Sequence, residues 1–174
     1  MALLAVFERA LRASFGDLRL ADPPAAAYLA ELLTRFVRVE AAFPRGLAAR
    51  RLETVADLLL EIQAAWQAPA AFAPEREVVL RRHIGDFTLF MTGIFPERVA
   101  RTASTRYYVA RGREAYRFVA EHDRASSRPV GRDGGRLYRR LADRFEAYVG
   151  VLDYARRVHF RDHPGRPFFR IAPG

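Results

Sequence analysis

The sequence reads RHIGDFTLFMTGIFPE from residue 82 to residue 97, and this stretch decides the fold. Between Ile84 and Phe95 the only charged residue is Asp86, and apolar residues fall on more than one side of the helix that the spacing predicts. A helix that is apolar on most sides belongs in the centre of a domain, because only there are all its faces shielded from water. We therefore predict a largely buried central helix over about residues 75–93.

The spacing of apolar residues is helical along most of the rest of the chain, without strand-like alternation of useful length. Asp22 before Pro23 is typical of a helix start, as is Ser104 or Thr105 before the helix that follows, while Gly16 ends the first helix. Besides the central helix, we predict helices at about residues 3–16, 23–42, 47–66, 96–101, 106–124 and 136–158, with a loop at 126–135. The predicted architecture is an all-α, single-domain bundle of about six to seven helices over residues 1–160, followed by an extended tail at 161–174.

The amino-acid composition excludes several kinds of catalytic and metal-binding chemistry. All 29 basic residues are Arg, and Lys, Asn and Cys are absent from the 174 residues, a usage that indicates a GC-rich, bacterial genome. Without Cys, the chain has no disulfide, thiolate metal site or cysteine nucleophile. With four Ser and no Gly-x-Ser-x-Gly motif, nucleophilic catalysis is disfavoured as well. We predict no cofactor.

The first residues, MALLAVFER, contain no basic leader and no cleavage site of small residues, so they do not resemble a secretory signal. No stretch approaches the roughly 20 apolar residues that a membrane-spanning helix needs. We therefore expect a cytoplasmic protein without a membrane partner.

The central helix places His83 and Asp86 one turn apart. A buried carboxylate needs a partner, because burying an isolated charge is costly. The helix predicted at 106–124 offers Tyr107, Tyr108, Arg111, Glu114 and Tyr116, and we expect Arg111 or Tyr108 to contact Asp86. One interpretation is a structural polar network. The second is a small-ligand pocket lined by His83, Asp86, Tyr108, Arg111 and Glu114, and the third is an acid–base pair of His83 and Asp86.

Residues 82–97, together with YYVARGREAY at residues 107–116, resemble segments of small, uncharacterised bacterial proteins that are helical. The resemblance covers about 35 of the 174 residues. It implies that these two helices form the shared centre of that family. It implies no activity and no catalytic residue.

A metal-dependent enzyme is an alternative reading. The order of His83, His122 and Asp123, followed by Asp153 or Asp162, is similar to that of the HD phosphohydrolases, which are helical metal enzymes. His159 and His163 have the i, i+4 spacing of metal ligands on a helix. However, Pro164 disfavours helical geometry at the residue before it.

The net charge of +9 belongs entirely to the second half of the chain. Residues 1–87 contain 11 Arg and 11 acidic residues, whereas residues 88–174 contain 18 Arg and 9 acidic residues. In the tail, Arg161, Arg166 and Arg170 alternate with aromatic residues that include Phe168 and Phe169. Arginine interleaved with aromatic side chains is typical of single-stranded nucleic-acid binding. Alternatively, the Phe residues pack on the domain or cross to the second subunit of a homodimer.

From these patterns we favour a binding or interaction module over an enzyme.

Overall fold

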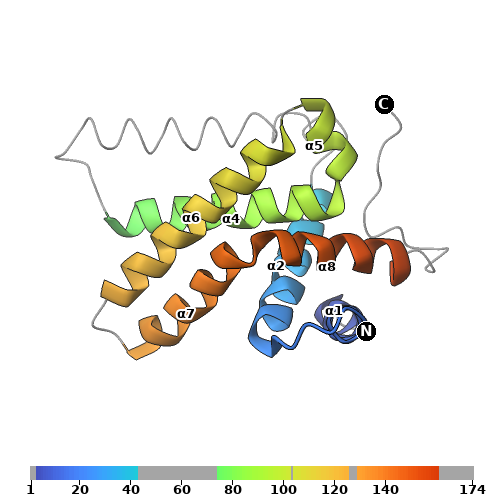
Figure 1. Ribbon diagram of the computed structural model, residues 1–174, viewed down its shortest axis with the longest axis horizontal. Coiled ribbons are helices and arrows are strands. Elements are labelled where there is room, and N and C mark those ends of the chain that lie inside the picture. Colours follow the sequence, from blue (N-terminus) through green and yellow to red (C-terminus); the bar gives the residue numbers. More distant parts are fainter. Residues whose placement is uncertain (1–2, 43–73, 103, 126–128, 161–174) are drawn as a thin grey trace.

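The structure, a computed structural model, describes residues 3–42, 74–102, 104–125 and 129–160, and the regular structure in these ranges is helical without any strand (Figure 1). The described helices are α1 (Leu3–Asp17), α2 (Pro23–Ala42), α4 (Pro74–Ile94), α5 (Pro96–Thr102), α6 (Thr105–Ala125), α7 (Pro129–Asp143) and α8 (Phe145–Val158). The predicted all-α bundle is confirmed. The helix predicted at 47–66 and the tail at 161–174 lie outside the described residues.

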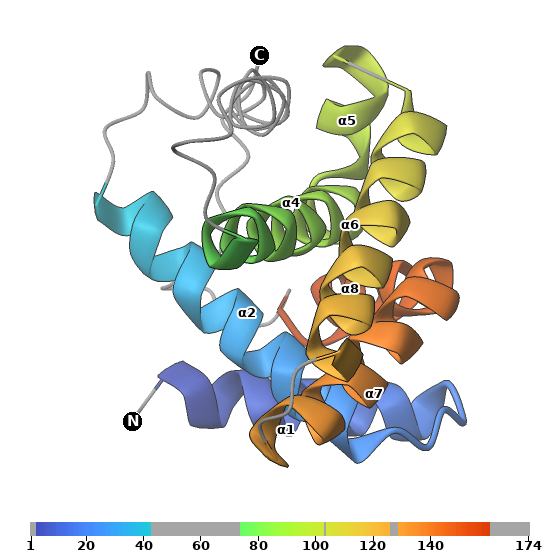
Figure 2. The ribbon, with the colours of Figure 1, turned by 90° about the vertical axis from the view of Figure 1, so that its left-hand side faces the viewer.

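Helix α4 is the centre of the bundle, as its sequence predicts. Every residue from Ile84 to Phe95 is buried. Figure 2 shows α4 nearly end-on, with α2 on one side of it and α6 on the other. Helices α6 and α8 make the most extensive contacts with α4, and α2 and α5 also pack against it. The apolar faces of α4 are therefore covered by four different helices.

Two predicted helix starts are confirmed by their hydrogen bonds. The Asp22 side chain accepts a bond from the Ala25 N–H at 3.2 Å, so it caps α2. The Ser104 hydroxyl accepts a bond from the Tyr107 N–H at 3.4 Å at the start of α6. Both side chains satisfy an N–H group that has no partner within its own helix.

The turn between α1 and α2 closes the end of α1 by backbone hydrogen bonds. Arg19 has a positive φ of 56° and donates its N–H to the Gly16 carbonyl at 3.0 Å. Leu20 donates to the Phe15 carbonyl at 2.9 Å. This pair of bonds defines a Schellman motif, which fixes where the chain turns towards Asp22.

The predicted single helix over 136–158 is wrong in two respects. Helix α7 already begins at Pro129, so most of the predicted loop is helical, and the chain changes direction at Arg144 between α7 and α8 (Figure 1). Proline suits the first turn of a helix, and packing against α6 outweighs the poor helix propensity of the glycines at 131–135. The sequence pattern does not reveal the break between α7 and α8, because the apolar residues continue in steps of three and four across Arg144.

None of the helices in the described ranges has the length and apolar character needed to cross a bilayer.

Candidate functional site

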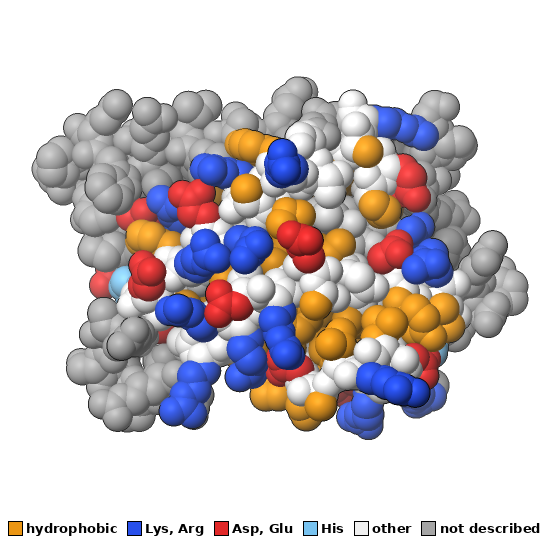
Figure 3. Space-filling view, in the orientation of Figure 1, with side chains coloured by type: hydrophobic (Ala, Val, Ile, Leu, Met, Phe, Trp, Pro, Cys, Tyr) orange, Lys and Arg blue, Asp and Glu red, His pale blue; other side chains and the backbone are white. Residues whose placement is uncertain are grey.

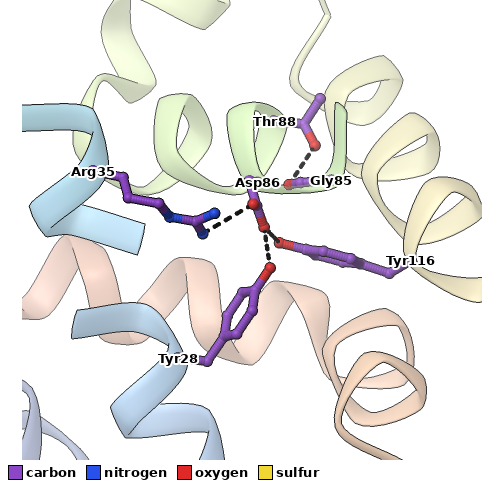
Figure 4. Close-up of polar contacts among 6 residues, drawn as sticks. All are labelled: Tyr28, Arg35, Gly85, Asp86, Thr88 and Tyr116. Atoms are coloured by element: carbon purple, nitrogen blue, oxygen red, sulfur yellow. Dashed lines mark hydrogen bonds and ion pairs between the residues drawn. The ribbon is translucent and has the colours of Figure 1, made fainter. Parts of the chain in front are cut away.

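Asp86 is the centre of a buried polar network, drawn in Figure 4. The residue is 3% exposed, and both of its carboxylate oxygens accept hydrogen bonds. The Tyr28 hydroxyl donates to Oδ1 at 2.5 Å, and the Tyr116 hydroxyl donates to the same oxygen at 2.8 Å. The Arg35 guanidinium donates to Oδ2 at 3.0 Å. Helices α2 and α6 thus both bind the Asp86 carboxylate of α4.

The electrostatics of this network follow from burial. Burial raises the pKa of Asp86, although the hydrogen bond from Tyr28 and the charge of Arg35 act in the opposite direction. Burial and the neighbouring carboxylate raise the pKa of Tyr28 and of Tyr116. Both tyrosines are therefore held in the protonated form, in which each can donate to Asp86.

The network reaches the surface through arginine. The Arg35 side chain is 48% exposed, and its guanidinium lies 5.8 Å from the centre of the Tyr28 ring. Tyr138 of α7 extends this cluster, because its ring packs against the Tyr28 ring at a centroid distance of 5.6 Å and against the Tyr116 ring at 5.9 Å. Four helices, α2, α4, α6 and α7, are thereby connected around one carboxylate.

A second buried aspartate has the same kind of partners. Asp22 caps α2, and its Oδ2 accepts bonds from the Arg140 Nε at 3.1 Å and the Tyr148 hydroxyl at 2.6 Å. Arg140 belongs to α7 and Tyr148 to α8, so Asp22 links the α1–α2 turn to the C-terminal helices. Both of these buried carboxylates are used to join helices.

The predicted partners of Asp86 are wrong. Arg111 pairs with Glu114 at 2.9 Å on the surface of α6 and lies over the Tyr107 ring instead. Tyr108 is buried, and its ring packs against Phe87. The reason is the rotation of α6 about its axis, which directs Gly112 and Tyr116 towards α4 and turns Arg111 away.

His83 lies on a different part of the surface of α4 from Asp86. Its ring stacks on Phe36 of α2 at a centroid distance of 6.2 Å, and the residue is exposed. Asp86, one turn further on, is buried. The two residues that sequence spacing placed together thus differ in exposure, His83 facing solvent and Asp86 lying inside the bundle.

Helices α4 and α6 are in direct contact beside Asp86. A Cβ atom added to Gly85 would lie 2.6 Å from the Tyr116 ring. One added to Gly112 would meet the hydroxyl oxygen of Thr88 and the Phe145 ring. This close approach needs glycine on both helices, because Tyr116 of α6 occupies the space at Gly85, and Thr88 of α4 with Phe145 of α8 occupies that at Gly112.

The proposed metal ligands His83, His122 and Asp123 do not come together. Nowhere in the described ranges do three or more His, Asp or Glu side chains gather as metal ligands would. His122 and Asp123 are neighbours on α6, with Nδ1 and Oδ1 3.9 Å apart. His163 and Asp162 of the other metal hypotheses lie outside the described residues.

Arginines gather on the face that α6 and α7 present, as Figure 3 shows in blue. Two of the carboxylates on this face neutralise an arginine each: Asp143 pairs with Arg139 at 3.5 Å, and Glu146 lies 4.0 Å from Arg113. We call the following set the basic face: Arg106, Arg113, Arg117, Arg136 and Arg139. The nucleic-acid residues predicted in the tail, Arg161, Arg166, Phe168, Phe169 and Arg170, lie outside the described part of the chain.

Comparison of the chain with family models, with curated proteins and with solved structures gives no match. The described residues form an all-α bundle in which two buried aspartates join helices.

Sequence reasoning missed Tyr28 and Arg35 as partners of Asp86, although it placed Tyr116 among the candidates. Tyr28 and Arg35 are seven residues apart, which puts them on one side of α2. That spacing is a usable signal, because a tyrosine and an arginine on one face can both bind a carboxylate. The sequence did not show that α2, rather than α6, supplies the charged partner.

The raised pKa values of Tyr28 and Tyr116 predict a loss of stability in alkali. The chain has neither Lys nor Cys, so tyrosine is the side chain that titrates near pH 10. A group whose pKa is higher in the folded than in the unfolded state stabilises the fold below its unfolded pKa, here about 10. That stabilisation is lost progressively as the pH rises above this value. We expect the free energy of unfolding in urea to fall between about pH 9.5 and 11.5.

The Tyr116→Phe variant tests the assignment. Removing one such group lessens the slope above pH 10 by up to about 1.4 kcal/mol per pH unit, because one proton fewer is released on unfolding. A variant with the same slope as the parent chain would show that Tyr116 is not part of the effect.

Proposed function

We propose that this protein is a binding module, not an enzyme, and that its basic face binds the backbone of single-stranded nucleic acid. The observation that supports the proposal is that several arginines of this face are exposed and, within the described ranges, unpaired. Arg106, Arg117 and Arg136 are exposed and have no ion pair among the described residues. An exposed guanidinium without a carboxylate partner offers its fork of donors to phosphate.

The arrangement of these arginines supports a continuous surface. Arg106, Arg113 and Arg117 are separated by seven and four residues, so they lie on one side of α6. Helix α7, which contributes Arg136 and Arg139, packs extensively against α6. Tyr107, at the start of the same helix, is 43% exposed and offers a ring for base stacking.

The buried groups give no comparable support to catalysis. The two buried aspartates already accept bonds from tyrosine, arginine and backbone N–H groups, and in doing so join helices. Glu114, which the sequence placed in a ligand pocket with Arg111, pairs with it on the surface. The arginines of α6 and α7 that are exposed and unpaired in the described part of the chain are charged groups that the fold does not use to join helices.

The double variant Arg117→Gln/Arg136→Gln tests this proposal. A labelled single-stranded oligonucleotide is titrated with protein while fluorescence anisotropy is followed at several salt concentrations. We expect binding that weakens steeply with salt, and a variant whose log–log salt slope is smaller by about 1.4, because each lost phosphate contact releases about 0.7 counterion.

The matched control is Arg9→Gln/Arg19→Gln, which removes the same charge from α1 and the turn after it. This control should keep the salt slope of the parent chain. No oligonucleotide binding even at low salt would overturn the proposal. Equal competition by a polyglutamate chain would also overturn it, because the face would then select charge alone.

A further inference from the structure

A pocket of about 310 Å³ lies where α1 turns into α2. Its volume is at the lower end of the range found for small-molecule sites, which is about 300–1,000 Å³. It belongs neither to the Asp86 network nor to the basic face, because its walls come from α1, the following turn and the first turns of α2.

The walls of the pocket are mainly apolar. Phe15 is 4% exposed, and Leu20 and Ala26 pack against the hydrophobic core. The Schellman motif holds Leu20 beside Phe15 and so fixes this part of the pocket. Asp22 also lines the pocket, but both of its oxygens are bound by Ala25, Arg140 and Tyr148. Asp22 therefore has a structural role here.

Two opposite charges stand at this pocket on α1. Glu8 and Arg12 are exposed lining residues one helical turn apart. Glutamate four residues before a basic residue is the favourable order for an ion pair. Nevertheless, neither residue forms an ion pair with the other or with any partner in the described part of the chain. A carboxylate and a guanidinium thus remain available beside an apolar cavity.

We infer that this pocket binds a small zwitterion with an apolar body, as in a free amino acid such as leucine or phenylalanine. The ligand carboxylate binds Arg12, its ammonium group binds Glu8, and its side chain lies against Phe15 and Leu20. A ligand with one charge satisfies only one of the two residues. A monocarboxylate also places its negative charge beside Glu8, which is unfavourable.

The inference is tested by calorimetric titration of the full chain with L-phenylalanine and with L-leucine. 3-Phenylpropanoate, which lacks the ammonium group, and 2-phenylethylamine, which lacks the carboxylate, are the matched probes. We expect one site per chain and at least about tenfold weaker binding of each phenylalanine analogue, as for the loss of one charge-assisted hydrogen bond.

Two variants assign the charges separately. Arg12→Gln should abolish the preference for phenylalanine over 2-phenylethylamine. Glu8→Gln should abolish the preference for phenylalanine over 3-phenylpropanoate. Gly16→Leu places a side chain at the pocket wall, where an added Cβ meets no atom within 4 Å, and should weaken all ligands while the helical circular dichroism is unchanged.

Lack of binding of both amino acids at about 10 mM, a concentration well above ordinary ligand affinities, would overturn the inference. Binding that neither Arg12→Gln nor Glu8→Gln weakens would overturn it too, because the ligand would then lie elsewhere.

Discussion

Replacing Asp86 with alanine should lower the free energy of unfolding by about 2–6 kcal/mol, because two tyrosine hydroxyls lose their buried acceptor at about 1–3 kcal/mol each. The substitution leaves the Tyr28 and Tyr116 hydroxyls and the Arg35 guanidinium without their acceptor. These groups come from two helices that pack on α4, so the loss affects the contacts of the whole centre. Urea unfolding followed by circular dichroism measures the effect.

Two further variants make this expectation falsifiable if the alanine variant does not fold. Asp86→Asn keeps the side-chain shape and one acceptor oxygen, but its amide N–H group faces another hydrogen-bond donor. The free energy of unfolding should therefore fall, but by less than in the alanine variant. Glu114→Ala removes an exposed carboxylate from a surface pair with Arg111 and should cost at most about 1 kcal/mol. If Asp86→Asn or Asp86→Ala costs no more than Glu114→Ala, the Asp86 network does not stabilise the fold.

Replacing Gly85 with alanine is the second change from which we expect a large effect, a loss of about 1–3 kcal/mol through overpacking. The new Cβ atom would lie 2.6 Å from Cε1 of Tyr116, closer than carbon atoms can approach. Tyr116 has no room to move, because it is fully buried and its hydroxyl is bound to Asp86. Either the ring or the two helices must shift, and each shift disturbs the network.

The matched control is Gly150→Ala in α8, where an added Cβ meets no atom within 4 Å. There the same substitution should stabilise the protein by about 0.5–1 kcal/mol, because alanine is the better helix former. Combining Gly85→Ala with Tyr116→Ala removes the clashing ring, so the cost of Gly85→Ala should largely vanish in that background. A cost that persists there would contradict the assigned clash.

The core of the fold was predictable from local pattern. The apolar faces of α4 indicated its burial, and the Asp22–Pro23 pair indicated where α2 begins. The break at Arg144 was not predictable in this way, since the residues on either side keep one apolar spacing. The partners of Asp86 were not predictable either, because a single sequence carries no information on how α2 and α6 are rotated towards α4.

The amino-acid pattern alone indicated that the chain forms helices, that α4 is largely buried, that Asp86 in its buried stretch needs partners and that the excess charge lies in the second half. These features depend on residues near one another in sequence, where helical geometry fixes the spacing. Tertiary packing selected Tyr28, Arg35 and Tyr116 over Arg111 and Tyr108, and left Arg106, Arg117 and Arg136 exposed. That selection depends on how each helix is rotated about its axis and on how closely helices approach at their glycines. Both are set by the packing of side chains from all the helices of the bundle.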